Sequence, residues 1–320
     1  MTSEQEELRE TLRRLLTRES DTRTAMTSSS GYDEKLWARL SALGLTALAT
    51  PSTCEATFLD TRVVLSELGR FVTPGPFLGS VVAAAAAESA GAAELLGEIA
   101  EGAVVSLVWG PYALNAQVAD VFLVPRDDSL YSLSRSEVDV TPAGGMDPTR
   151  RMATVTPLAD GQLLGEPDLA YVQDVASAAL CAESAGAAAR CLELTVDYTK
   201  QRTQFGRPIG SFQALKHRMA DLHVLVETAE SASLAAATAV AAGEDLAHTA
   251  ATAHVWCTEA FSQVAAEMIQ LHGGIAITWE HDAHLYFKRA HGNTHLFGSP
   301  RAHTARLGVG LGGFFGTHHT

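Results

Sequence analysis

The chain has 320 residues, 47% of them hydrophobic, which is enough for two or three domains around a sizeable core. Its 23 Lys and Arg residues against 37 Asp and Glu residues give a net charge of −14, and this argues against nucleic acid binding, which needs a basic surface. The four cysteines form no CxxC pair, so we expect no zinc ribbon, no redox dithiol and no disulfide framework. This cysteine usage is typical of a reducing cytoplasm.

No targeting or membrane segment is apparent in the sequence. The N-terminus, MTSEQEELRE, is acidic and has no apolar core, so we expect no secretory signal. The apolar stretch from Val81 to Ala87 is far shorter than the roughly 18 residues that a membrane span needs. We therefore expect a cytoplasmic protein with no membrane and no nucleic acid partner.

Residues 1–102 are predicted to form a helical N-terminal domain. Ser3 and Glu6 match a capping box before leucines at helical spacing. Asp33 is a suitable N-cap for a second helix, which we expect to end before Gly44. Apolar spacing and alanine content predict two further helices, over 62–68 and 81–93.

Residues 103–168 lack the helical periodicity of the preceding segment and predict a small β-domain. Short β-branched and apolar runs alternate with turn residues, as in a few antiparallel strands. We expect these strands over 104–109, 118–124, 130–133 and 152–155.

Residues 169–320 return to helical periodicity and predict an up-and-down bundle. We expect its helices over 184–201, 212–242, 245–271 and roughly 280–290. The C-terminal glycines from Gly308 to Gly313 have the spacing of a dinucleotide-binding loop, but no strand is expected before them. We therefore reject a Rossmann site and expect a flexible terminus.

Several charged or metal-binding side chains are candidates for chemistry. Glu183 lies in a small, apolar stretch, where a carboxylate is either a structural acid paired with a residue such as Arg190 or a general base with a raised pKa. The histidines fall in two pairs at helical spacing, His281 with His284 and His291 with His295. Exposed or interface histidines are the favoured interpretation over a metal site, since no H-E-x-x-H motif is present.

The most distinctive segment follows the end of a predicted helix and runs from Arg202 to Gly210. It combines arginines, an aromatic residue and turn glycines in the sequence RTQFGRPIG. An arginine fork can hold a phosphate and a phenyl ring can cover an aromatic ligand. By composition alone, a plain turn explains the segment equally well.

These residues carry a resemblance to the acyl-CoA dehydrogenase family. The sequence RTQFGRPIGSFQALKH over 202–217, MAD over 219–221 and QLHGGI over 270–275 are similar to that family's C-terminal domain. ELG over 67–69 and PGPFL over 74–78 resemble its N-terminal domain, and DPTR over 147–150 resembles the end of its middle domain. The resemblance covers nearly the whole chain. It implies a mostly α fold with a helical N-terminal domain, a reduced middle β-domain and a C-terminal four-helix bundle.

The resemblance also implies a cofactor and the residues that hold it. Members form tetramers with FAD across subunit interfaces, and the ADP end contacts a neighbour's RxxFG and QxxGG segments. Carried over, Arg202 would hold the pyrophosphate, with Gln204 and Phe205 beside it. The adenosine side would be approached by three further residues, Gln270, Gly273 and Gly274. A glutamate would remove the α-proton of an acyl-CoA substrate while the β-hydride goes to the flavin.

The chain departs from the family pattern at the catalytic base and at the flavin ring. In family members the base lies at one of two positions. Counted forward from the QxxGG motif without gaps, the first position holds Phe297, and counted back from the RxxFG motif, the second falls at about Ala176. Neither side chain accepts a proton. The middle domain is about half the usual size and lacks both flavin-ring segments of the family. No catalytic residue is therefore assigned to this chain.

Both departures suggest the short, degenerate subunit of the heteromeric α2β2 acyl-CoA dehydrogenases of actinobacteria. Such a subunit would complete the FAD site of a longer homologous subunit that carries the base, acting on a bulky steroid side-chain acyl-CoA with an electron-transfer flavoprotein as acceptor. One alternative is a self-sufficient homomeric enzyme whose base has moved to Glu183 or Asp282. Another is a flavin-free structural scaffold.

Overall fold

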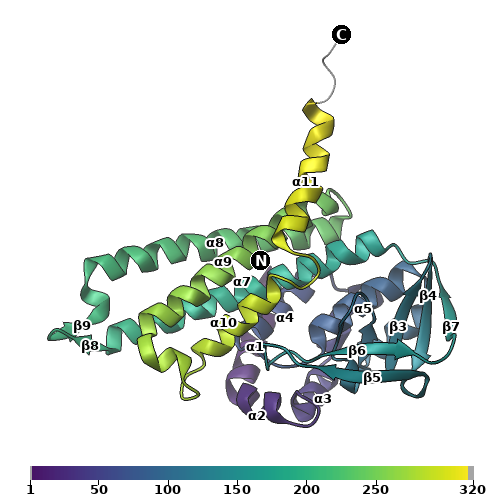
Figure 1. Ribbon diagram of the computed structural model, residues 1–320, viewed down its shortest axis with the longest axis horizontal. Helices are drawn as coiled ribbons and strands as arrows, with labels where there is room; N and C mark the ends of the chain where they lie inside the picture. Colours follow the sequence, from purple (N-terminus) through teal and green to yellow (C-terminus); the bar gives the residue numbers. More distant parts are fainter. Residues whose placement is uncertain (1, 316–320) are drawn as a thin grey trace.

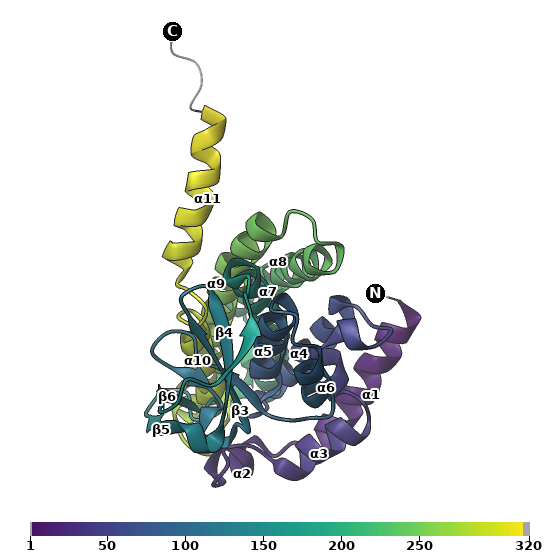
Figure 2. The same cartoon turned by 90° about the vertical axis from the view of Figure 1, so that its right-hand side faces the viewer.

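The computed structural model describes residues 2–315, which build a helical layer, a small β region and a long helical bundle. Figures 1 and 2 show the N-terminal helices and the strands packed beside the bundle, with the last helix extending away from the body. The helical layer ends at Ala100 and the bundle begins at Leu169. On these limits we propose the domain ranges 1–102, 103–168 and 169–320.

The N-terminal layer contains six helices, and side-chain caps at Thr2, Asp21 and Asp33 start the first three. They are α1 (Ser3–Glu19), α2 (Thr22–Thr27), α3 (Glu34–Ala42), α4 (Phe58–Arg70), α5 (Phe77–Ser89) and α6 (Ala93–Ala100). The capping box of α1 lies one residue earlier than expected, between Thr2 and Gln5. Asp33 caps α3 as predicted, and α3 ends before Gly44, which has a φ of +73°.

The middle region forms two small sheets, with strand orders β1-β3-β4-β7 and β2-β6-β5. Their strands are β1 (Val105–Leu107), β2 (Ala113–Leu114), β3 (Val121–Arg126), β4 (Ser129–Ser134), β5 (Val138–Ala143), β6 (Met152–Pro157) and β7 (Gln162–Gly165). The expectation of antiparallel strands alone is wrong for one pair, because β1 and β3 run parallel. The chain between them crosses to the other sheet to form β2 and therefore returns in the same direction.

The bundle consists of α7 (Leu169–Gln201), α8 (Gln213–Ala242), α9 (Leu246–His272), α10 (Ala283–Asn293) and α11 (Pro300–Phe315). The limits predicted for α8 and α9 agree to one residue, whereas α7 begins 15 residues before the expected 184. Asp168 caps this earlier start by accepting from the backbone N–H groups of Ala170 and Tyr171. Nearly all of the small side chains between Val175 and Ala188 are buried, so this part of α7 lacks the amphipathic pattern that marks a surface helix.

The glycines up to Gly313, where the sequence predicted a flexible terminus, lie within α11. The Ser299 side chain accepts from the N–H of Ala302 (3.3 Å) and its carbonyl from the N–H of His303 (3.1 Å), which starts the helix. In the described residues, the last strand before these glycines ends at Pro208, far from α11. A Rossmann loop follows directly after a strand, so these glycines do not form one.

Of the described helices, α8 alone has the length and apolar composition that could cross a membrane. Its contacts are those of a bundle helix, since it packs against α7 and α9. Arg218 on α8 pairs with Glu267 on α9 at 2.5 Å, and Glu230 pairs with Arg62 on α4. Helix α8 is therefore a helix of the bundle, and its buried face packs against α7 and α9.

Helices α4 and α7 cross at two glycines that allow their backbones to touch. A Cβ at Gly186 would lie 2.0 Å from the carbonyl oxygen of Ser66, and one at Gly69 would lie 2.1 Å from that of Glu183. Only residues without a side chain permit this approach. The crossing joins the N-terminal layer to the bundle.

Replacing Gly186 by Ala is expected to destabilise the protein by about 1–3 kcal/mol, because the helices must separate to admit the methyl group. Urea unfolding of the purified variants would measure the change. The matched control is Gly97→Ala on α6, where the added Cβ meets nothing within 4 Å and helix propensity should raise stability by up to about 1 kcal/mol. Equal effects of the two substitutions would show that the close crossing contributes nothing.

Candidate functional site

The RxxFG and QxxGG segments meet at one end of the bundle. Helix α7 ends at Gln201 and leads into a hairpin of β8 (Thr203–Gln204) and β9 (Arg207–Pro208), which lies at the far left of Figure 1. Tyr198, one turn before the hairpin, stacks on His272 at the end of α9, with ring centroids 4.3 Å apart. The Tyr198 hydroxyl also donates to the carbonyl of His272 at 3.2 Å. These contacts bring together two segments about 70 residues apart in the chain.

The candidate cofactor-binding side chains at this end all face outward. Six residues are exposed: Arg202, Gln204, Phe205, Gln270, Gly273 and Gly274. We call these six residues the bundle-end cluster. Phe205 is 91% exposed. An outward-facing group of a guanidinium, two amides and a ring can bind only a ligand that lies outside this chain's own core.

Phe212 packs against two residues of the hairpin and stabilises its conformation. The Phe205 ring meets the Phe212 ring edge to face, with centroids 6.2 Å apart, and the guanidinium of Arg207 lies 4.0 Å from the Phe212 ring centre. Phe205 has a φ of +53°, a left-handed conformation that is uncommon for an aromatic residue. The exposed ring is therefore positioned by its surroundings, at a cost in backbone strain.

The QxxGG segment leaves room for a ligand beside its backbone. Gly273 has a φ of +67°, which favours glycine, and ends α9. A Cβ at Gly273 or Gly274 would meet no atom within 4 Å, so the space above both glycines is open.

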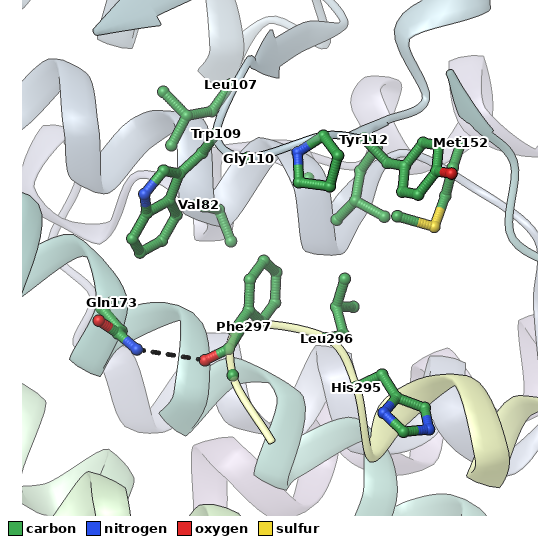
Figure 3. Close-up of a pocket in the computed structure, with 14 residues that line it drawn as sticks. Val82, Leu107, Trp109, Gly110, Tyr112, Met152, Gln173, His295, Leu296 and Phe297 are labelled. Atoms are coloured by element: carbon green, nitrogen blue, oxygen red, sulfur yellow. Dashed lines mark hydrogen bonds between the residues drawn. The ribbon is translucent and has the colours of Figure 1, made fainter. Parts of the chain in front are cut away.

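A separate pocket of about 440 Å³ lies between α5, the β1–β2 connection and the loop after α10. Its walls include Trp109, Tyr112 and Phe297, which surround the cavity in Figure 3. The carbonyl of Phe297 accepts a hydrogen bond from the side chain of Gln173 at 3.3 Å. None of the residues that line this pocket, all in the described part of the chain, has a carboxylate.

The two positions of the family's base have different surroundings. Phe297 lines the pocket, so it occupies a place where a base could reach a bound ligand. Ala176 is completely buried within α7 and does not line this pocket. Neither side chain can remove a proton.

Glu183 is paired with two arginines, and this pairing favours a structural acid over a relocated base. Its carboxylate pairs with Arg150 and, at 3.0 Å, with Arg289, and it does not contact the expected partner Arg190. Burial alone would raise the pKa of Glu183, but the two guanidinium charges outweigh it and lower the pKa to about 2. A carboxylate this acidic is a poor base.

The pair of arginines belongs to a larger buried network between the middle region and the bundle. Arg289 donates to Asp147 at 2.6 Å and to the carbonyl of Thr149 at 2.9 Å, while Arg150 donates to the Asn293 side chain at 3.0 Å. The network ties the 147–150 loop to α7 and α10 near the pocket.

Asp282, the other candidate for a relocated base, lies at the surface away from the pocket of Phe297. Its carboxylate is 56% exposed and pairs with Arg23 at 2.6 Å. It does not line the pocket that contains Phe297, so it cannot act on a ligand there.

The histidine pairs do not form a metal centre in the part of the chain that the structure describes. His281 contacts His272, with ring centroids 4.6 Å apart, and His291 contacts His295 at 5.2 Å. His295 lines the pocket beside Phe297.

A third histidine contact, which sequence reasoning missed, supports the loop of Phe297. His254 and His303 are fully buried and stacked, with centroids 4.0 Å apart. Burial lowers the pKa of His254 to about 3, with a further contribution from His303, so the ring is neutral. Nε2 of His303 lies 3.1 Å from the carbonyl oxygen of Phe297. The two residues are 49 positions apart, and no spacing rule connects them.

Comparison with known proteins agrees with the expected family. Residues 2–99 match the acyl-CoA dehydrogenase N-terminal domain and residues 174–310 match the acyl-CoA dehydrogenase C-terminal domain. The chain is 45% identical to acyl-CoA dehydrogenase IpdE2 of Mycobacterium tuberculosis, over 95% of this chain and 96% of that protein.

Solved structures show the same fold. A variant of the Tcur3481-Tcur3483 steroid ACAD matches with a TM-score of 0.86 and 26% identity, over 98% of this chain and 99% of that one. The ChsE4-ChsE5 complex from Mycobacterium tuberculosis matches with a TM-score of 0.85 and 24% identity, over 97% and 98% of the two chains. The expected fold class, with its helical, β and helical parts, is confirmed.

Proposed function

Because the chain belongs to the acyl-CoA dehydrogenase family of flavin-dependent oxidoreductases, we propose that it is the FAD-completing subunit of a heteromeric enzyme. In this proposal a longer homologous subunit provides the base and the two form an α2β2 assembly. One observation carries the proposal: the residues suited to holding FAD and the position suited to a base differ in what they retain. The bundle-end cluster is present and faces outward, whereas the pocket at Phe297 has no carboxylate.

The bundle-end cluster suits the ADP part of FAD. Arg202 offers a planar fork of donors that matches phosphate oxygens, and the amides of Gln204 and Gln270 offer further hydrogen bonds. The open space above Gly273 and Gly274 admits close approach of an adenosine to the backbone. FAD bound there would supply the acceptor for the hydride that leaves the β-carbon of the acyl group. The residues of this chain bind and orient its phosphates and adenosine.

The names of two similar structures support a proposal for the substrate and the partner. One similar structure is a steroid ACAD and another is a complex of two named proteins, so we propose a bulky steroid side-chain acyl-CoA as substrate and a longer acyl-CoA dehydrogenase as partner. An electron-transfer flavoprotein is the proposed electron acceptor, and the proposed location is the cytoplasm. We propose no nucleic acid or membrane partner, in keeping with the net charge of −14.

Arg202→Ala is expected to weaken FAD retention of the co-expressed complex by about 10- to 100-fold. A charge-assisted contact to phosphate is worth roughly 1.5–3 kcal/mol, and each 1.4 kcal/mol is tenfold in affinity. Arg202→Lys should restore only part of the affinity, because a point charge lacks the bidentate fork. Flavin content per complex and activity after gel filtration would measure both.

The control is Arg301→Ala. Arg301 is also exposed, but it lies on α11 and outside the bundle-end cluster. It should leave flavin content and assembly unchanged. If Arg202→Ala keeps both flavin and activity at the wild-type level in an assembled complex, the shared cofactor site is wrong. A flavin-free scaffold then becomes the better explanation.

A further inference from the structure

A second pocket, rich in arginine, has no part in the proposed function. It has a volume of about 170 Å³ and lies between α1, α4, α7 and α8, where Ser66 and Gly186 cross. Its lining residues all lie in the described part of the chain, and none belongs to the bundle-end cluster or to the pocket at Phe297. We infer that this arginine pocket binds a phosphate group, which takes the place of carboxylates at its rim.

Four guanidinium groups from two packed helices line the pocket. Arg9 and Arg13 come from α1, and Arg62 and Arg70 come from α4. Residues four apart lie on one face of a helix, so Arg9 and Arg13 project into the same space. The side chains of Arg62 and Arg70 are 6% and 10% exposed. These two therefore form a buried floor, while Arg9 and Arg13 are partly exposed at the mouth.

The arginines include buried donors without an acceptor. Within the described residues, the Nε atoms of Arg70 and Arg9 are buried and have no hydrogen-bond partner. The carboxylate of Glu67 lies 3.7 Å from Nε of Arg70, which is beyond hydrogen-bond distance. A buried donor left in this way loses its hydration without compensation. An oxygen atom of a bound anion would supply the missing acceptor.

The carboxylates around the pocket differ in how firmly they are held. Glu67 is buried and accepts two hydrogen bonds from Arg13, one of them at 2.9 Å, so it remains in place. Glu230 and Glu193, which pair with the two floor arginines, are 47% and 45% exposed. Glu227, another acid of the lining, is also exposed. Exposed ion pairs contribute little to stability, so Glu230 and Glu193 can turn into solvent when a more highly charged anion enters.

The size of the pocket and the geometry of its donors favour a phosphate group. The volume is below the 300–1,000 Å³ of pockets for larger small molecules, so a whole nucleotide does not fit. Guanidinium forks match phosphate oxygens, and donors from two helices can reach a tetrahedral group from several sides. Ser66 adds a hydroxyl to the same lining. The phosphate group belongs either to the free ion or to an ester whose remainder stays outside the mouth.

The test is calorimetric titration of the full-length chain with inorganic phosphate and with glycerol 3-phosphate, in a buffer free of both. We expect one site per chain in the arginine pocket. Tighter binding of inorganic phosphate would identify the free ion as the ligand, and tighter binding of glycerol 3-phosphate would identify an ester. Sodium chloride at equal ionic strength should give no binding isotherm.

Removing a competing carboxylate should strengthen phosphate binding. Glu230→Gln frees Arg62 of its carboxylate partner and should raise the affinity by about two- to fivefold. A purely structural role of this ion pair would not raise the affinity for an anion. The matched control is Glu267→Gln, which breaks the pair with Arg218 outside the pocket and should leave the affinity unchanged.

Removing an arginine at the mouth should weaken phosphate binding. Arg9→Gln is expected to lower the affinity by about tenfold, because one charge-assisted contact is lost. Its control is Arg18→Gln on the same helix, since Arg18 is exposed and lies outside the lining. Both variants leave the buried floor of Arg62 and Arg70 intact.

Arg202→Ala separates the arginine pocket from the proposed FAD site. It should leave phosphate binding by the lone chain unchanged, and Arg9→Gln should leave the flavin content of the co-expressed complex unchanged. Loss of phosphate binding in Arg202→Ala but not in Arg9→Gln would place the anion at the bundle-end cluster and overturn the inference. No phosphate binding by the wild-type chain, an equal isotherm with chloride, or no gain of affinity in Glu230→Gln would overturn it as well.

Discussion

Purified without a partner, the chain is expected to oxidise acyl-CoA thioesters about 10²- to 10⁴-fold more slowly than the co-expressed complex, and to hold little FAD. Loss of a general base accounts for this range of rates. Phe297 lines the pocket where a base would act, and the lining has no carboxylate. Glu183 is held by two arginines, and Asp282 lies outside the pocket.

The measurement compares two preparations, the chain alone and the chain co-expressed with a longer acyl-CoA dehydrogenase subunit. Flavin absorbance per mole of protein and reduction of an electron-accepting dye by acyl-CoA would be recorded for both. The complex should be yellow and active. Stoichiometric flavin together with turnover in the lone chain would contradict the prediction and would require a base that the structure does not identify.

Helix ends with local signals could be predicted from the sequence, and buried helix starts could not. Asp33 and Gly44 bound α3 as expected, because capping depends on a few neighbouring residues. The first half of α7 was missed because burial on all sides removes the 3.6-residue pattern. The parallel pairing of β1 with β3 depends on a crossover between two sheets, which no short pattern records.

In the candidate site, too, residues that belong to a motif could be predicted from the sequence, and contacts between distant segments could not. Motif resemblance pointed to Arg202 and Gln270, and the structure places their segments side by side through Tyr198 and His272. The partners of Glu183 could not be predicted, because Arg150 and Arg289 come from segments 33 and 106 residues away. The small residues around Glu183 indicated only that a buried carboxylate there needs a paired charge or hydrogen-bond donors.

Glu183→Gln is expected to destabilise the protein by about 3–5 kcal/mol at pH 7, the usual cost of stranding buried charges. The substitution keeps the shape of the side chain but removes the charge between Arg150 and Arg289. Arg289 retains Asp147, whereas Arg150 retains only neutral partners such as Asn293. Urea unfolding followed by circular dichroism would measure the free energy of unfolding.

The pH dependence and a second variant identify the cause. Since the pKa of Glu183 is lowered from 4.5 to about 2 in the folded state, its stabilising contribution is fully present above pH 4.5 and is lost as the pH falls through about 2. The difference between wild type and Glu183→Gln should therefore narrow below pH 4.5. Glu193→Gln is the control on the same helix: Glu193 is 45% exposed and pairs with Arg70 at 2.6 Å, so its loss should cost no more than about 1 kcal/mol. Equal costs for the two variants, or a difference independent of pH, would mean that the buried network does not hold the middle region to the bundle.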